Sequence, residues 1–363
     1  MTVLSVLDVA PVAQGSDPGQ ALRNSLDLAR HAERLGYRRF WLAEHHNMPG
    51  IASAATSVAI GYVAGGTSTI RVGAGGIMLP NHAPLAIAEQ FGTLESLFPG
   101  RIDLGLGRAP GSDQVTAQAM RRSLSGEEDR FPQDVAELIA LFRPVVEGQP
   151  VQAVPGAGLE VPIWILGSST FGAQLAAYLG LPFAFAAHIG PQALETALAV
   201  YRQGFRPSER LQQPYVMLTM NTIAAESDEE ARFLASSMQQ AFVSQRTGRP
   251  GRLPPPVEGY AEGLDPDRRA MLKDFLSLAV VGGPRTVQTQ LESFAARHGA
   301  DELILLSQIF DHSKRVRSLE VAAGVMAGEV AEVEGNQMFT DMGAERRSAP
   351  MSASMAQRNS RIR

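Results

Sequence analysis

Residues 3–36, VLSVLDVAPVAQGSDPGQALRNSLDLARHAERLG, contain the unit from which the fold is built. The apolar run Val3–Leu7 predicts a buried strand. Asp17 can cap a helix, and Gln20 stands where a capping box places its polar partner. We expect this helix to end at Gly36, because glycine readily adopts the left-handed conformation that closes a helix. The stretch therefore predicts one strand followed by one helix.

The same unit recurs about every 30 residues along the chain. The predicted strands are Val3–Leu7, Arg39–Ala43, Ile70–Gly73, Ile102–Leu106, Pro162–Leu166, Pro182–Ala186, Tyr215–Met220 and Glu302–Leu306. The later helices are predicted at Ser53–Ala64, Pro84–Leu97, Phe131–Phe142, Phe171–Leu179, Gln192–Arg202, Pro284–Arg297 and from near His312. Eight strands, each with a helix, predict an α/β fold, the (β/α)8 TIM barrel. A doubly wound open sheet is the alternative, but the G-x-G-x-x-G that usually follows its first strand is missing.

Two segments depart from a minimal barrel. Ser227 to Ser277 interpolates about two extra helices around the Pro/Gly-rich stretch 249–259, between the seventh strand and its regular helix. We expect this insertion to lie over the mouth of the barrel. Beyond Gly328 the pattern fades, which predicts a barrel domain over residues 1–330 and a polar, flexible tail over residues 331–363.

The composition excludes several classes of protein. Of the 363 residues, 45% are hydrophobic and 19% are charged, as in an ordinary globular chain. The formal net charge of −5 gives no long-range attraction for nucleic acid. The lack of cysteine excludes disulfides, thiolate nucleophiles and cysteine zinc sites. No secretory leader and no run of about 18 apolar residues stands out, so we expect a cytoplasmic protein without a membrane span.

Polar residues gather directly after the predicted strands, where the active sites of TIM barrels form. These positions are Glu44-His45-His46-Asn47, Gly75-Gly76, Asn81-His82, Arg108, Gly167-Ser168-Ser169, His188 and Asn221. They include four of the seven histidines, which favours a catalytic or ligand-binding mouth. His45 and His46 are consecutive, so one of them should face the mouth and the other should face away.

An anion site is predicted at the turn Gly167-Ser168-Ser169, between a strand and a helix. Free backbone N–H groups, the helix dipole and two hydroxyls can bind a phosphate there. Arg108 could add a guanidinium. The alternatives are an ordinary serine cap for the turn, and for Arg108 a surface position or a pairing with Asp113. The two features together favour a phosphate-bearing cofactor.

Two other barrel chemistries fit the sequence less well. A metal site could draw on Glu44, His45, His82 and His188, but the first strand lacks the H-x-H pair of amidohydrolase barrels. We therefore predict no metal. A Schiff-base aldolase needs a lysine on an inner strand, and the two lysines, Lys273 and Lys314, stand in predicted helical segments.

Four blocks carry these rim residues in a fixed order. They are WLAEHHN at 41–47, RVGAGGIMLP at 71–80, GRIDLGLGRAPG at 100–111 and WILGSS at 164–169. In order and spacing they resemble the bacterial luciferase-like flavin monooxygenase family, and the resemblance covers about residues 1–330. It implies that the protein uses reduced FMN as a co-substrate with dioxygen. The flavin C4a-hydroperoxide so formed would oxygenate a small organic substrate.

The resemblance also implies roles for individual residues. His45 matches the family's active-site histidine near the reacting edge of the flavin. Gly75 and Gly76 match a pair that forms a non-prolyl cis peptide under the flavin ring, where glycine on both sides relieves crowding. Arg108 and the serines 168 and 169 match positions that hold the phosphate, in agreement with the anion site.

Partners follow from the same comparison. No NAD(P)H fingerprint stands out in the sequence, so we expect a separate NAD(P)H:flavin reductase to supply the reduced flavin. The family dimerises through the region of Ser53–Ala64 and Pro84–Leu97, whose small residues allow close packing; we expect a homodimer, with packing against the barrel as the alternative. Two other functions stay open: hydride transfer with a flavin or deazaflavin, and non-catalytic FMN binding.

Overall fold

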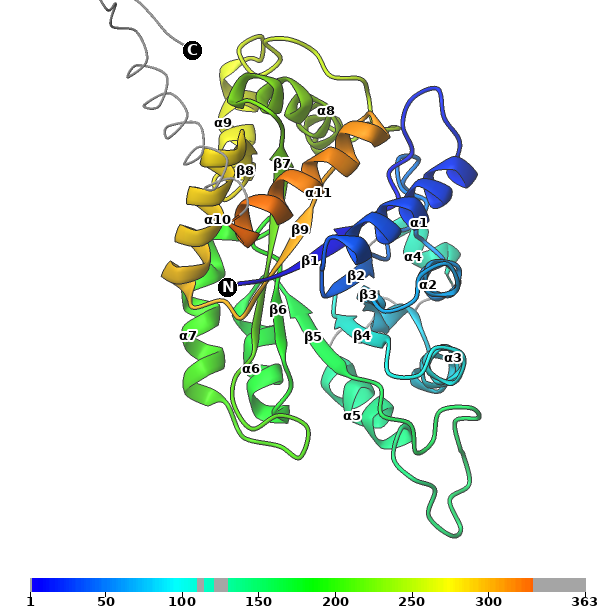
Figure 1. The fold of residues 1–363 in the computed structure, drawn as a ribbon. Helices are drawn as coiled ribbons and strands as arrows, with labels where there is room; N and C mark the ends of the chain where they lie inside the picture. Colours follow the sequence, from blue (N-terminus) through cyan, green and yellow to red (C-terminus); the bar gives the residue numbers. More distant parts are fainter. Residues whose placement is uncertain (1, 110–113, 121–129, 329–363) are drawn as a thin grey trace, which may run out of the picture.

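Eight parallel strands close into a barrel in the order β1, β2, β3, β4, β5, β6, β7 and β9 (Figure 1). The computed structural model of the protein describes residues 2–109, 114–120 and 130–328. The barrel strands are β1 (Val3–Asp8), β2 (Arg39–Leu42), β3 (Arg71–Met78), β4 (Ile102–Gly107), β5 (Ile163–Gly167), β6 (Phe183–Phe185), β7 (Val216–Ala224) and β9 (Glu302–Leu306). Pairing of β9 with both β1 and β7 completes the ring. The predicted TIM barrel is confirmed.

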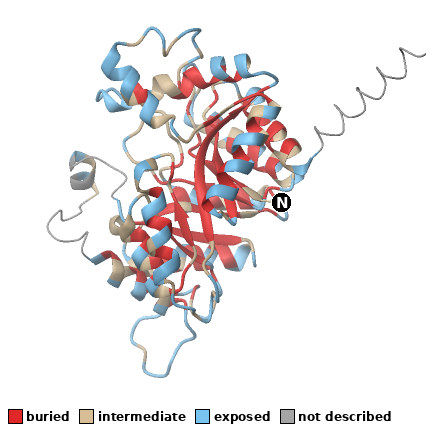
Figure 2. Ribbon diagram, turned by 90° about the vertical axis from the view of Figure 1, so that its left-hand side faces the viewer, coloured by how far each residue is buried: buried red, intermediate tan, exposed pale blue. Residues whose placement is uncertain are grey.

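Helices surround this barrel. They are α1 (Pro18–Arg34), α2 (Thr56–Gly65), α3 (Pro84–Leu97), α4 (Gln114–Ala119), α5 (Phe131–Leu141), α6 (Thr170–Leu179), α7 (Leu194–Gly204), α8 (Asp228–Arg246), α9 (Pro266–Phe275), α10 (Pro284–His298) and α11 (His312–Ala327), with short 3-10 turns η1 (Leu79–Asn81) and η3 (Pro191–Ala193). Figure 2 shows the buried strands at the centre and exposed helical faces outside. Among the helices of the described ranges, none is long and apolar enough to cross a membrane.

The first helix shows how local sequence sets the boundaries of an element. The Asp17 carboxylate accepts the backbone N–H of Gln20 at 2.9 Å, which satisfies an otherwise unpaired donor of the first turn. The Gln20 side chain donates to Asn24 at 2.8 Å and makes no return bond to the cap, so half of the expected capping box forms. Gly36 follows the helix with a left-handed φ of 78°.

Several boundaries differ from the sequence-based expectation. Strand β3 continues to Met78 and β7 to Ala224, beyond the predicted ends. An additional strand, β8 (Val280–Gly282), pairs with the end of β7 and was not predicted, because three residues are too short for a pattern. The helix expected from Ser53 begins at Thr56, since the Ser53 hydroxyl donates to the Ala43 carbonyl at 2.6 Å. The predicted tail, residues 331–363, lies outside the described residues.

The inside of the barrel is apolar and aromatic toward its middle. Trp41 and Trp164 meet edge to face with ring centroids 5.2 Å apart, and Trp164 meets Tyr215 in the same way at 5.5 Å. Leu7, Met217 and neighbouring aliphatic side chains pack into the same cluster. A second, larger apolar layer lies between the strands and the surrounding helices.

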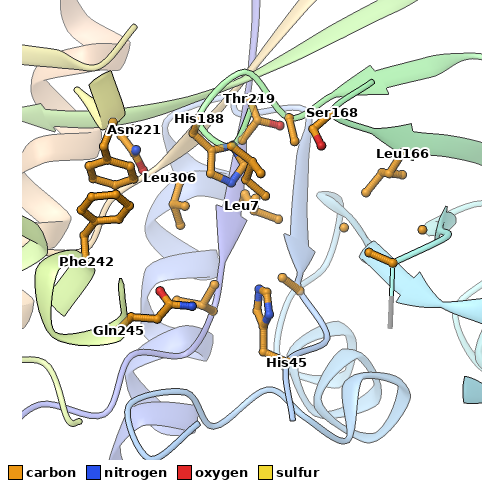
Figure 3. Close-up of a pocket in the computed structure, with 18 of the residues that line it drawn as sticks. Leu7, His45, Leu166, Ser168, His188, Thr219, Asn221, Phe242, Gln245 and Leu306 are labelled. Carbon is orange, nitrogen blue, oxygen red and sulfur yellow. The ribbon is translucent and has the colours of Figure 1, made fainter. Parts of the chain in front are cut away.

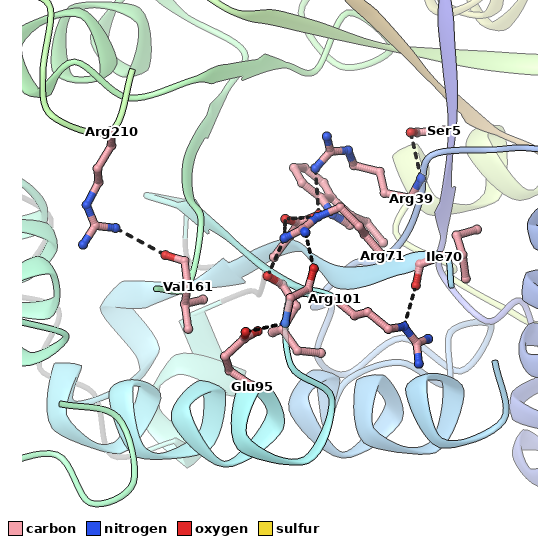
Figure 4. Close-up of polar contacts among 12 residues, drawn as sticks. Ser5, Arg39, Ile70, Arg71, Glu95, Arg101, Val161 and Arg210 are labelled. Carbon is pink, nitrogen blue, oxygen red and sulfur yellow. Dashed lines mark hydrogen bonds and ion pairs between the residues drawn. The ribbon is translucent and has the colours of Figure 1, made fainter. Parts of the chain in front are cut away.

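Buried ion pairs fill the N-terminal end of the barrel (Figure 4). The Arg39 guanidinium donates to Asp103 and to Glu302, both at 2.7 Å. Arg71 donates to the other oxygen of Asp103, also at 2.7 Å, and Tyr215 donates to Glu302 at 2.9 Å. Both carboxylates are fully buried, and the two arginines balance their charges. This end of the barrel is therefore closed, and the open end is the C-terminal one.

Candidate active site

A cavity of about 1120 Å³ opens at the C-terminal ends of the strands. This is slightly more than the roughly 300–1,000 Å³ of most small-molecule sites, so a cofactor and a substrate fit together. Most of the predicted site residues line it, namely His45, Gly75, Arg108, Gly167, Ser168, Ser169, His188 and Asn221. Gly76, the next residue after Gly75, is not among the lining residues.

The residues after β2 are oriented by Glu44, which is 1% exposed. Its carboxylate accepts the Nε2–H of His46 at 2.8 Å and of His82 at 2.9 Å, and the backbone N–H of Met78 at 3.0 Å. His46 and His82 are thus held against Glu44, while His45 faces the cavity (Figure 3). The expectation that one of the two consecutive histidines faces the mouth is confirmed.

Hydrogen bonds lower the pKa of Glu44. Burial by itself would raise it, but the bonds from His82, His46 and the Met78 backbone, with the charge of His82, bring it below its ordinary value of 4.5. Glu44 is therefore an anion that accepts hydrogen bonds from four groups of the described chain, the fourth being Asn81 at 3.2 Å. In the described part of the chain, no three side chains form a metal-binding group.

Two imidazoles face the cavity. Burial lowers the pKa of His45; the charge of Glu44 opposes this shift and His46 adds to it. Burial, with a smaller contribution from His45, lowers the pKa of His188 to about 4. Both side chains are therefore neutral at pH 7, and each can accept or donate one proton at a ring nitrogen.

The peptide bond between Gly75 and Gly76 is cis, as the resemblance implies. A Cβ on Gly75 would lie 2.7 Å from a methyl carbon of Leu7, and a Cβ on Gly76 would lie 2.7 Å from the Gly105 carbonyl oxygen. The contact at Gly76 is with backbone and leaves no room for a side chain, whereas a side chain at Gly75 would have to displace Leu7. At Gly75 the wall of the cavity is therefore bare backbone, and Met78 also lines the cavity from β3.

The residues of the predicted anion site lie together near the start of α6. Ser169 occupies the N-cap position with an extended backbone, but its hydroxyl makes no capping hydrogen bond. The Arg108 guanidinium lies 4.1 Å from the ring centroid of Phe171, the second residue of the helix. A guanidinium, two hydroxyls and the free N–H groups of a helix start thus meet at one corner. Asp113, the alternative partner of Arg108, lies outside the described residues.

The insertion, expected over the mouth of the barrel, contributes to the wall of the cavity. Residues of α8 and α9 line the cavity, among them Met238, Phe242, Gln245 and Phe275. The rings of Phe242 and Phe275 stack at 3.8 Å with an angle of 11°. Sequence reasoning missed this aromatic wall, because it depends on two helices of the insertion meeting in space.

Sequence reasoning also placed Asn221 after its strand, whereas Asn221 lies within β7. The alternation of β7 directs Thr219 and Asn221 into the cavity, and Thr219 was missed. Two-residue periodicity in a strand extended past Met220 could have found it.

Comparison with known proteins gives the family. A sequence model described as "Luciferase-like monooxygenase" matches residues 1–302. The chain belongs to the luciferase-like monooxygenase family. A relative named "Luciferase-like monooxygenase" from Escherichia coli (strain K12) is 54% identical over 321 residues, which cover 88% of this chain and 96% of the relative.

Solved structures agree with this luciferase-like fold. The crystal structure of apo-MsnO8 has a TM-score of 0.81 and 35% identity, covering 90% of this chain and 99% of that one. A Pseudomonas putida type II Baeyer-Villiger monooxygenase in complex with FMN (TM-score 0.67, 18% identity, covering 89% and 96%) shares the fold alone. So does an F420-dependent secondary alcohol dehydrogenase (TM-score 0.64, 16% identity, covering 89% and 99%).

The contribution of the Glu44 carboxylate to the stability of this luciferase-like protein can be tested by Glu44→Gln. We expect the free energy of unfolding at pH 7 to fall by about 1.5–3 kcal/mol, because hydrogen bonds to a buried charge are replaced by bonds to a neutral amide. The folded-state pKa is lowered, so the contribution is complete above pH 4.5 and is lost as the pH falls through the folded-state value. Urea unfolding at a series of pH values should show the two proteins converging in acid.

Glu226→Gln is the control, because that carboxylate is 58% exposed in its pair with Arg317 and should contribute less than about 1 kcal/mol. A difference between wild type and Glu44→Gln that stays constant down to acid pH would show that the charge of Glu44 is irrelevant.

Proposed function

We propose that this protein is an FMN-dependent monooxygenase, which uses reduced FMN and dioxygen to oxygenate a small organic substrate. A separate NAD(P)H:flavin reductase supplies the reduced flavin. The observation that carries the proposal is the meeting, in one cavity, of an anion-binding corner, a bare glycine wall and a neutral imidazole.

The residues present fit FMN. Arg108, Ser168 and Ser169 would hold the phosphate, since the Ser169 hydroxyl is not used by its own helix and Arg108 is positioned on Phe171. The backbone at Gly75 would hold the flat ring, because no side chain projects from this position into the cavity. When bound, reduced flavin supplies two electrons and reacts with dioxygen.

The protein's own groups would then control water and protons. His45 is neutral and faces the cavity, so it can accept a proton from, or donate one to, the reacting group. Aliphatic side chains of the barrel and the Phe242–Phe275 stack would help to exclude water around the bound flavin.

Hydride transfer with a flavin or with F420 is the second candidate function. It is favoured by the fold shared with the F420-dependent dehydrogenase and by the same anion corner, which any phosphorylated cofactor can use. The neutral His45 serves either chemistry, so cofactor binding and oxygen incorporation must decide between them.

The phosphate corner is tested by Arg108→Ala. We expect the dissociation constant for FMN to rise about 10- to 100-fold, because a charge-assisted bond to phosphate is lost. Riboflavin, which lacks the phosphate, should bind the variant and the wild type equally. Titration calorimetry measures the dissociation constants of FMN and riboflavin, and also that of F420.

Arg23→Ala on α1 is the matched control, since Arg23 is exposed and bonds to Gln20. If Arg108→Ala weakens FMN and riboflavin alike, the corner does not bind phosphate. If neither oxidised nor reduced FMN binds at micromolar protein, the proposed function is wrong.

The proton role of His45 is tested by His45→Ala with photoreduced FMN and ¹⁸O₂. Wild-type protein should incorporate the label into a substrate found by screening, and the variant should do so about 10² to 10⁴ times more slowly. FMN affinity should change little. His31→Ala, at a helix surface remote from the cavity, should behave like wild type.

Oxidation of the substrate without incorporation of ¹⁸O would favour hydride transfer. Tight FMN binding would favour a non-catalytic binding protein if reduced flavin reacts with oxygen as it does in the absence of the protein. Rapid NADPH oxidation by the purified protein with added FMN would contradict the separate reductase.

We further propose a homodimer through α2 and α3, where Val58 is 72% and Leu97 is 65% exposed. Val58 and Tyr62 stand four residues apart on one face of α2.

Sedimentation equilibrium of the wild type should give twice 38.8 kDa, and the double variant Val58→Lys, Tyr62→Lys should give the single-chain mass. Val146→Lys, at an exposed valine outside these helices, should leave the assembly unchanged. A wild-type mass of one chain would refute the dimer.

A further inference from the structure

Asn221 is a buried polar side chain whose hydrogen-bonding capacity is unused. It is 1% exposed and lines the cavity. Neither its Oδ1 nor its Nδ2 has a hydrogen-bond partner among the described residues. An unpaired amide in the interior lowers the stability of the folded protein, so its presence calls for a ligand that completes it.

The closed barrel places Asn221 across the cavity from the glycine wall. Three strands separate β7 from β3 in either direction around the ring. Figure 3 shows Asn221 beside Phe242 on one side of the cavity, with Ser168 and Leu166 on the other. A ring held at Gly75 therefore leaves Asn221 facing the space where a substrate would lie.

Apolar side chains form part of the cavity wall beside Asn221. Leu306 is its partner across the strand pair with β9, and the stacked rings of Phe242 and Phe275 complete this side. The charged lining residues of the described chain, Arg108, Arg246 and Asp274, are all exposed. An ionised group placed at Asn221 would lose its hydration without meeting an opposite charge.

His188 provides a second unpaired group nearby in the barrel. It follows β6, which pairs with β7, and its Nδ1 is buried without a partner among the described residues. The imidazole also lines the cavity. The two neighbouring strands thus offer a short row of neutral hydrogen-bonding atoms.

We propose that Asn221 anchors the substrate subsite, and that the substrate carries a neutral group which both donates and accepts a hydrogen bond, a carboxamide or lactam, on an apolar or aromatic body. The inference rests on the proposed function, because the flavin occupies the other half of the cavity. The Asn221 amide pairs with the substrate amide, and the apolar body packs against Phe242 and Phe275.

Calorimetry with three probes of similar shape tests the subsite in FMN-saturated protein. Benzamide donates and accepts, acetophenone accepts, and benzoate is charged. We expect benzamide to bind at least about tenfold more tightly than the other two probes. Acetophenone would leave the Asn221 carbonyl oxygen unpaired, and benzoate would bury a charge. Asn221→Leu, of similar volume, should abolish this preference and leave the FMN dissociation constant unchanged.

A thermal scan of the ligand-free protein separates binding from a structural role. Asn221→Leu should raise Tm, because it replaces an unpaired buried amide with an apolar side chain; a structural asparagine would give a lower Tm. Thr222→Val is the matched control. Its hydroxyl is also buried and unpaired in the described chain, but Thr222 is not among the cavity-lining residues.

Equal binding of benzamide by wild type and Asn221→Leu would overturn the inference while leaving FMN binding, and so the proposed function, intact. Loss of FMN affinity in Asn221→Leu would also overturn it, by assigning the residue to the flavin. If wild type takes up no FMN, the proposed function fails, and the same titrations on flavin-free protein still decide whether Asn221 selects amides.

Discussion

The ion pairs of Arg39 constrain the rest of the barrel. Arg39 lies on β2, Asp103 on β4 and Glu302 on β9, and the Ser5 hydroxyl of β1 also donates to Glu302. Buried charges are costly unless every partner is present, since removal of one leaves another uncompensated. The cluster therefore favours the one strand arrangement that brings all its members together. Because ions and aromatic rings fill this end, the free volume of the barrel lies at the C-terminal end, where strands lead into variable loops.

Glu44 has the corresponding organising role at the open end. It joins the end of β2 to the end of β3 and to η1, through His46, the Met78 backbone and His82. A run of consecutive histidines could place either ring in the cavity. The buried carboxylate decides, because it binds the ring of His46 and leaves His45 free to face the cavity. The orientation of His45 thus depends on a residue that does not itself line the cavity.

The sequence carries most of the barrel, because buried parallel strands appear as apolar runs at regular spacing. The sequence was less informative where glycines replace side chains or where contacts join residues that are distant in the sequence. The glycines of β3 hide its true length, and β8 is held by pairing with β7 rather than by its own three residues. At the site, the serine turn could be located because its signal is local to one helix start, and Arg108 because it directly follows a strand. Their role in binding phosphate stays a prediction. The Phe242–Phe275 stack could not be located, because its partners lie 33 positions apart within an insertion of irregular pattern.

The two walls of the cavity follow different physical rules, and this difference bears on how one fold serves several reactions. The wall of β3 and α6 offers backbone, hydroxyls and one guanidinium, groups that recognise a phosphate and a flat ring whatever the reaction. The wall of β7 and the insertion offers side chains, and a side chain can change without disturbing the glycines or the helix start. A single replacement at Asn221 would alter which polar group is tolerated there, since it would remove an unpaired amide from this wall. Under the proposed function, the wall of β3 and α6 would select the class of cofactor, and a few residues on the facing strand β7 would select the class of substrate.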